Sequence, residues 1–138
     1  MDEKTHPNIF PTLRYEDASA AVDWLGRAFG FEEKAVYRGE DGTVHHAELR
    51  LGAGLVMLGQ HRNGDAMDDT ASDPLSSAQG IYVVVEDPDA HHYRAESAGA
   101  RIIMGLTDQD YGSREYSARD LEGNVWSFGT YDPYAAGG

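Results

Sequence analysis

The sequence has no cysteine in its 138 residues. This absence excludes disulfide bonds, thiolate metal ligands and a cysteine nucleophile. A chain without cysteine is compatible with either redox compartment, and it suits the cytoplasmic location that we expect here.

Long hydrophobic runs are also absent. No stretch approaches the roughly 20 consecutive apolar residues that a membrane-spanning helix needs. The first seven residues lack the order of basic and then apolar residues that is typical of a signal peptide. We therefore expect no membrane span and no secretion signal.

Basic residues are scarce: 11 Lys and Arg oppose 24 Asp and Glu, which gives a formal net charge of −13. Such a surface repels nucleic acid and anionic membranes and attracts cations. The negative charge has two interpretations: it keeps the protein soluble, or it favours the binding of a cationic ligand. The sequence also lacks a P-loop, a Gly-x-Gly-x-x-Gly turn after a strand and a Gly-x-Ser-x-Gly elbow, so nucleotide-binding and hydrolase functions are disfavoured.

The patterns that are present predict a β-α-β-β-β order over residues 8–60. Asp17 is a good helix N-cap, apolar residues follow it at helical spacing, and Gly30 is a suitable stop, so a helix is predicted over 18–29. Alternating segments between turns predict strands at 9–15, 31–38, 43–51 and 55–59.

The same order returns over residues 80–131. Asp87 and Pro88 begin a second helix, which ends near Ala98, and the strands are predicted at 80–85, 101–106, 113–119 and 124–130. The two halves align at an offset of 70, since 87 − 17 = 70 for the two capping aspartates. A repeat of this size predicts two similar modules packed in one domain, residues 1–138, with residues 61–79 as a polar linker or lid.

Alternation along the strands assigns side chains to faces. Trp126 and Phe128 fall on one face of the last strand, and Ser127 falls on the other. In the strand over 43–51, the apolar Ala47, Leu49 and Leu51 share one face, and His46, Glu48 and Arg50 share the opposite one. If the apolar row packs on the helices, the polar row faces a ligand, and otherwise it is a solvated strand face.

Three motifs carry a family resemblance. They are Arg-Tyr-Glu-Asp17 before a helix that ends in Ala-Phe-Gly-Phe31, then His-Ala-Glu-Leu-Arg-Leu-Gly52, and then Arg-Asp-Leu-Glu-Gly-Asn-Val-Trp126. With the repeat, over roughly residues 8–131, the chain resembles the vicinal oxygen chelate superfamily, which includes glyoxalase I, bleomycin-resistance proteins and extradiol dioxygenases. Within this superfamily, the chain most resembles the small single-domain glyoxalase-like and bleomycin-resistance-like members.

The resemblance implies an α+β fold in which two βαβββ modules form a U-shaped sheet, or cup, with the helices outside. It also implies a homodimer, because small members usually pair and exposed sheet edges need cover. A small-molecule ligand is the partner implied, with no nucleic acid and no membrane.

Metal-dependent members carry His, Gln or Glu at one position on the first and last strands of each module. The matching positions here are Phe10, Met57, Gly80 and Ser127. A thioether prefers soft metals and a neutral hydroxyl is a weak ligand. We therefore predict no metal site and no cofactor, an inference that depends on the strand registers because a slip of one residue exchanges the faces.

The histidines do not offer an alternative metal site. His45 and His46 are adjacent on a strand and point to opposite faces, while His91 and His92 lie on the second helix, where we expect them to be exposed. No His-Glu-x-x-His pattern is present. We expect most of the histidines to be surface or structural residues.

The predicted binding site is a mostly apolar cup with a few polar groups, as small-ligand binding requires. His46 matches Tyr116 at the offset of 70, and the tyrosines are candidates for stacking because they join an apolar ring to a polar tip. The predicted ligand-binding residues are Phe10, Thr12, His46, Glu48, Met57, Tyr82, Tyr111, Tyr116 and Ser127.

Two functions follow from this site. The first is a metal-free binding protein of the bleomycin-resistance-like type, which sequesters a hydrophobic or cationic molecule such as an antibiotic. The alternative is a glyoxalase-like lyase or isomerase that is metal-independent, with Glu48 or His46 as the catalytic base, or that uses unconventional metal ligands. A pKa of Glu48 raised by burial would favour the enzyme.

Overall fold

The computed structural model describes residues 7–61 and 80–136, which fall into two compact units. We call residues 7–61 module one and residues 80–136 module two, and each is described by itself. The predicted linker or lid lies outside the described residues, apart from His61.

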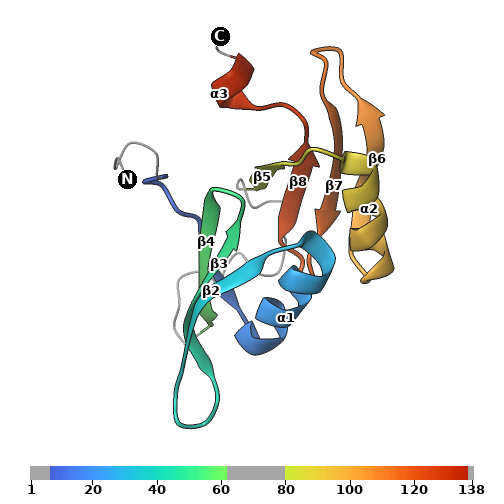
Figure 1. Cartoon of the computed structure of the whole chain (residues 1–138). Helices are drawn as coiled ribbons and strands as arrows, with labels where there is room; N and C mark the ends of the chain where they lie inside the picture. The colour runs from blue at the N-terminus through green and yellow to red at the C-terminus, as the bar shows by residue number, and fades with distance from the viewer. Residues whose placement is uncertain (1–6, 62–79, 137–138) are drawn as a thin grey trace. The chain divides into compact units, whose positions relative to one another are not determined.

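Module one is a four-stranded sheet with one helix (Figure 1). Its elements are β1 (Thr12–Tyr15), α1 (Ala18–Phe29), β2 (Glu32–Arg38), β3 (Val44–Leu51) and β4 (Gly54–Gln60). The strand order is β1-β4-β3-β2, in which β1 runs parallel to β4 and the other neighbours are antiparallel. Helix α1 covers one face of this sheet.

The bounds of α1 are those that the sequence predicts, because both end signals act as expected. The Asp17 side chain accepts a hydrogen bond from the backbone N–H of Ala20, which satisfies a free donor of the first turn. Gly30 has φ 91°, a left-handed conformation that favours glycine, and it ends the helix. Leu25 and Phe29 are among the apolar side chains that the helix buries against the sheet.

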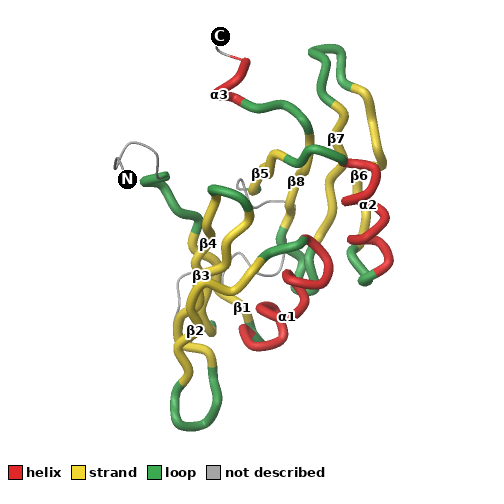
Figure 2. The backbone as a smooth tube through the Cα atoms, in the orientation of Figure 1, coloured by secondary structure: helices red, strands yellow, loops and turns green. Residues whose placement is uncertain are grey.

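Module two repeats this order (Figure 2). Its elements are β5 (Ile81–Val84), α2 (Pro88–Ser97), β6 (Arg101–Asp108), β7 (Arg114–Arg119), β8 (Val125–Gly129) and the short α3 (Pro133–Ala136). The strand order is β5-β8-β7-β6, and β5 is again parallel to β8. The predicted α+β class with two βαβββ modules is confirmed.

The first strand of module one is shorter than predicted. It begins at Thr12, three residues after the predicted start, so Phe10 precedes the strand and is 39% exposed. Pro11 has no N–H to donate, and only its carbonyl takes part in pairing, by accepting the backbone N–H of Met57 at 2.9 Å.

The core of module two lies between α2 and the sheet. Tyr116 and Phe128 are fully buried there and their rings stack at a centroid distance of 5.2 Å. The centroid of the His91 ring, on α2, lies 4.3 Å from the centroid of the Phe128 ring. The expectation that His91 is exposed is therefore wrong, because its imidazole is half-buried against these rings.

The turn before β8 is organised by a buried carboxylate. Gly123 lies between the predicted strands over 113–119 and 124–130 and has φ 95°, a left-handed conformation that favours glycine. The sequence did not predict the role of Asp120, which is 6% exposed. Its side chain accepts the backbone N–H groups of Glu122 and Asn124 and the indole N–H of Trp126, each at 3.0 Å. The turn and the largest core side chain are thus tied to one residue.

Candidate functional site

Each sheet has one face opposite its helix, which we call the helix-free face. In module one, the buried Ala47, Leu49 and Leu58 point to α1, so the alternate residues of β3 and β4 point away from it. Thr12, Met57 and Glu48 are direct neighbours across β1, β4 and β3. The predicted grouping of Thr12, His46, Glu48 and Met57 on one face is confirmed for module one.

Glu48 is the centre of a charged group on this face. The Nε2 atom of His46 lies 3.0 Å from one carboxylate oxygen, and the ammonium of Lys34 lies 3.4 Å from the other. The ring of Tyr37, on β2, stacks on His46 at a centroid distance of 5.8 Å. Sequence reasoning missed Lys34 and Tyr37, and the pairing of β2 with β3 is the signal that would have found them.

The environment of Glu48 keeps its carboxylate ionised. The hydrogen bond from His46 is the largest cause that lowers its pKa, and the contact with Lys34 lowers it further. The condition that we set for a catalytic Glu48, a pKa raised by burial, is therefore not met. A carboxylate with a lowered pKa is a weak general base and a good partner for a cation.

In module two, the helix-free face carries a row with the same geometry. Tyr82, Ser127 and Ser117 are direct neighbours across β5, β8 and β7. The hydroxyl oxygens of Ser117 and Ser127 lie 2.7 Å apart, so one serine donates to the other. The row therefore offers neutral hydroxyl groups where module one offers Met57 and Glu48.

Tyr116 does not belong to this face. It pairs with Phe128 across the strands and points to α2, where it is 0% exposed. Its hydroxyl lies 2.6 Å from Nδ1 of His91, and burial raises its pKa. The prediction that Tyr116 shares a face with Ser127 is wrong, and Ser117 takes that place.

The other two predicted tyrosines gather around a carboxylate that sequence reasoning missed. The hydroxyl of Tyr111 lies 2.9 Å and 3.0 Å from the two carboxylate oxygens of Glu115. The hydroxyl of Tyr82 donates to the backbone carbonyl of Tyr131 at 2.8 Å. The rings of Tyr111 and Tyr131 meet edge to face at a centroid distance of 6.0 Å. Alternation along β7 places Glu115 with Ser117, and this was the available signal.

The strand registers show which first-strand residues lie beside Met57 and Ser127. The first-strand residues beside Met57 and Ser127 are Thr12 and Tyr82, because Phe10 and Gly80 precede the strands. Neither Thr12 nor Tyr82 has an imidazole, a carboxylate or an amide in its side chain. Within residues 7–61 and 80–136, no three His, Asp or Glu side chains are placed to hold a metal ion together. The absence of a metal site stays a prediction.

Comparison with known proteins gives the family. A sequence model of the Glyoxalase/Bleomycin resistance protein/Dioxygenase superfamily matches residues 9–128. The chain belongs to this superfamily. In the part of the chain that the structure describes, none of the helices has the length and apolar character to span a membrane.

Two similar proteins match nearly the whole chain. The uncharacterised protein Rv0887c of Mycobacterium tuberculosis is 35% identical over 135 residues, which cover 94% of this chain and 77% of that protein. The crystal structure of TioX from Micromonospora sp. ML1 is 37% identical with a TM-score of 0.70, and the match covers 89% of this chain and 97% of TioX.

A more distant structure shares the fold alone. The fosfomycin resistance protein FosX of Listeria monocytogenes, in a complex with Mn(II), is 11% identical with a TM-score of 0.66. The match covers 90% of this chain and 89% of FosX. At this identity the manganese of FosX says nothing of metal binding by this superfamily member.

Proposed function

We propose that this superfamily member is a metal-free binding protein of the bleomycin-resistance-like type. It sequesters a hydrophobic or cationic small molecule, such as an antibiotic, against the helix-free faces of its modules. The observation that carries the proposal is that neighbouring residues of the first and last strands of each module lack an imidazole, a carboxylate or an amide. These residues are Thr12 and Met57 in module one, and Tyr82 and Ser127 in module two.

The charges favour a cationic group in the ligand. The chain has a formal net charge of −13, which raises the local concentration of cations. Glu48 is held in its ionised form on the helix-free face, as described above. Tyr37 stands next to His46 and adds an aromatic surface for the apolar part of a ligand.

The second candidate is a metal-independent lyase or isomerase, and the contact between His46 and Glu48 is the observation that favours it. A carboxylate that accepts a hydrogen bond from an imidazole N–H fixes the orientation and the tautomer of the ring. His46 is then the base and Glu48 the residue that positions it. A glyoxalase-like reaction with unconventional metal ligands is the remaining form of this alternative.

Calorimetry with a panel of cationic glycopeptide and aromatic antibiotics tests the binding function. We expect at least one compound to bind with a sub-millimolar Kd, and the affinity to stay the same after treatment with a chelator. Uniform absence of binding at sub-millimolar concentration would reject sequestration of antibiotics. Stoichiometric nickel, zinc, iron or manganese in protein purified without chelators would reject the metal-free state.

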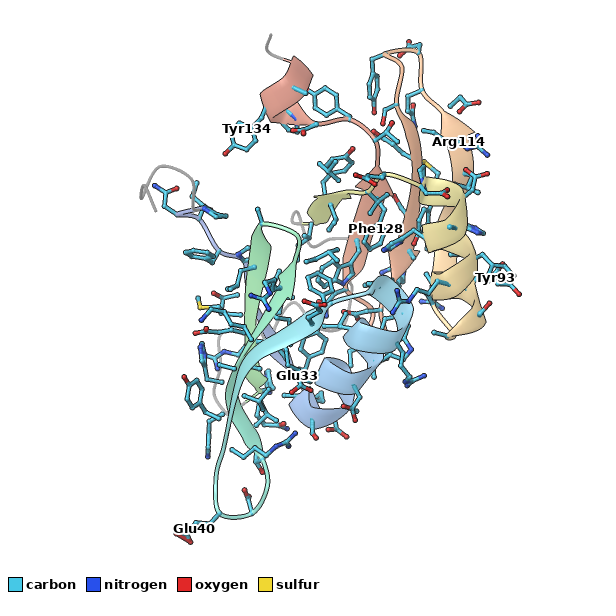
Figure 3. The ribbon with its side chains drawn as sticks, viewed as in Figure 1. Glu33, Glu40, Tyr93, Arg114, Phe128 and Tyr134 are labelled. Atoms are coloured by element: carbon cyan, nitrogen blue, oxygen red, sulfur yellow. The ribbon has the colours of Figure 1, made fainter. Side chains whose placement is uncertain are left out.

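The variant Glu48→Gln resolves the role of the charged group. For a compound with a cationic group, we expect about tenfold weaker binding, because a partly screened charge is lost with little change in shape. Binding of uncharged aromatic compounds stays unchanged. Glu33→Gln is the matched control, since Glu33 is exposed on the same sheet and lies beside Leu49 in the register (Figure 3).

We also propose that the protein is a homodimer. Strands β1 and β2 are the edges of one sheet, and β5 and β6 are the edges of the other. Unpaired strand edges favour association unless another chain covers them. Sedimentation at micromolar concentration should give twice the mass of the chain, and the mass of a single chain would contradict the proposal. The cytoplasmic location stays a prediction.

A further inference from the structure

Tyr82 belongs to a group of four side chains in module two, and the proposed function gives the other three no role. We call Tyr82, Tyr111, Glu115 and Tyr131 the tyrosine–glutamate cluster. The three tyrosines are partly exposed, by 38%, 59% and 40% in chain order, and Glu115 is half-buried among them. A ligand from solvent therefore reaches the aromatic rings, while the carboxylate is partly shielded from water.

The residues of the cluster converge because Gly129 has no side chain. Gly129 is the direct neighbour of Glu115 in the register of β7 and β8. A Cβ atom at this position would meet Cγ of Glu115 and would lie 2.9 Å from the hydroxyl of Tyr82. The side chains of Tyr82 and Glu115 thus both pass over β8 at Gly129, which places the phenol of Tyr82 next to the carboxylate of Glu115.

The carboxylate of Glu115 lacks a cationic partner in the described part of the chain. Its only hydrogen-bond donor there is the hydroxyl of Tyr111. The nearest arginine in sequence, Arg114, points to the other side of the strand, where it pairs with Asp89 of α2 and Asp108 of β6 (Figure 3). A half-buried carboxylate without an opposite charge attracts a cation.

The chemistry of the cluster selects the kind of cation. One carboxylate supplies too few oxygens for a divalent metal ion, which needs several converging donors. Aromatic rings beside a negative charge suit a weakly hydrated organic cation, which gains from the rings and loses little hydration. Asp110 and Asp132 add negative charge near Tyr111 and Tyr82.

We propose that the tyrosine–glutamate cluster binds the alkylammonium group of an organic cation. This inference rests on the proposed function and deepens it, because it adds to Glu48 of module one a second place, in module two, that binds a cationic group of a sequestered ligand. It does not require that the whole ligand be an antibiotic. A simple cation is enough to test it.

Titration with choline, followed by ligand-observed NMR at constant ionic strength, tests this site. We expect saturable binding with a Kd on the order of 1 mM, in line with a few cation–π contacts and one charge. The uncharged isostere 3,3-dimethylbutan-1-ol and sodium ions serve as competitors. Neither should displace choline, and equal binding of the isostere would overturn the proposal.

Three variants assign the binding to the cluster. Glu115→Gln should weaken choline binding about tenfold, because it removes the charge. Tyr111→Leu should weaken it about threefold, whereas Tyr111→Phe keeps the ring and should bind at least as well as the parent. Glu96→Gln is the control for charge, since Glu96 is exposed on α2 in the same module.

The outcomes separate this inference from the proposed function. Choline affinity that is the same in Glu115→Gln and Glu96→Gln would overturn the cluster as a site. If an antibiotic binds and choline affinity is the same in Glu115→Gln and Glu96→Gln, sequestration stands and this inference fails. If choline binding follows Glu115 and no antibiotic binds, the cluster stands and sequestration of antibiotics fails.

Discussion

Replacing Asp120 with alanine should lower the free energy of unfolding by about 3 kcal/mol. The Asp120 carboxylate is buried and accepts hydrogen bonds from Glu122, Asn124 and Trp126. Alanine leaves these donors without an acceptor, and the indole N–H of the fully buried Trp126 has no access to water. A buried donor without a partner costs about 1–3 kcal/mol, and the two backbone donors of the turn add to this loss.

Urea denaturation followed by circular dichroism measures the effect, with the m-value checked for two-state behaviour. Asp120→Asn is the graded variant, because one side-chain oxygen can still accept from the backbone of Glu122 and Asn124. We expect it to lose about half as much free energy. It also keeps the test informative if the alanine variant does not fold.

A double-mutant cycle with Trp126→Phe isolates the bond to the indole. Phenylalanine removes the donor and keeps an aromatic ring, so Asp120→Ala should cost about 1 kcal/mol less in this background. If the two backgrounds give the same loss, the indole bond contributes nothing, and the turn alone accounts for the effect. This result would contradict the role that we assign to Asp120.

The register of the same hairpin explains why Tyr116 points to α2 and not to the face of Ser127. The offset of 70 residues holds from Thr12 to Tyr82 and from Met57 to Ser127. It fails on the strand between them, because 57 − 48 = 9 in module one, whereas 127 − 117 = 10 in module two. The turn around Asp120 contains one extra residue, and one residue exchanges the faces of a strand.

Patterns within a single segment were sufficient to predict the ends of a helix and the two faces of a strand. The Asp17 and Gly30 signals set both ends of α1, and alternation separated His46 and Glu48 from Ala47 and Leu49. The contacts that define the candidate site depend instead on pairing between strands. Lys34 reaches Glu48 across a register shift in β2, and Glu115 meets Tyr82 above a glycine. No pattern within a single segment contains that information.

Replacing Gly59 with alanine should lower the free energy of unfolding by about 2 kcal/mol. A Cβ atom on Gly59 would lie 2.7 Å from the backbone carbonyl oxygen of His45, closer than real contacts allow. Strand β4 is held between β1 and β3, so the backbone has little freedom to withdraw. The stabilising effect of alanine on the unfolded chain, about 0.4–1 kcal/mol, is smaller than this strain. Urea denaturation should show the loss, and a change below about 0.5 kcal/mol would contradict it.

The equivalent glycine of module two should respond differently to a second substitution. At Gly129 the obstacles are side chains, Cγ of Glu115 and the hydroxyl of Tyr82, rather than a carbonyl. Gly129→Ala should therefore cost about 2 kcal/mol in the parent and much less beside Glu115→Ala, which removes Cγ.

Arg14→Ala supplies the contrast in module one. It clears the guanidinium that lies 3.2 Å from a Cβ on Gly59, but it leaves the carbonyl of His45 in place. It should therefore rescue Gly59→Ala only slightly. We expect the second substitution to restore stability in module two and not in module one. This result would mean that position 129 must be glycine because the side chains of Glu115 and Tyr82 pass over it. Both belong to the tyrosine–glutamate cluster. Equal rescue in both modules would contradict this distinction.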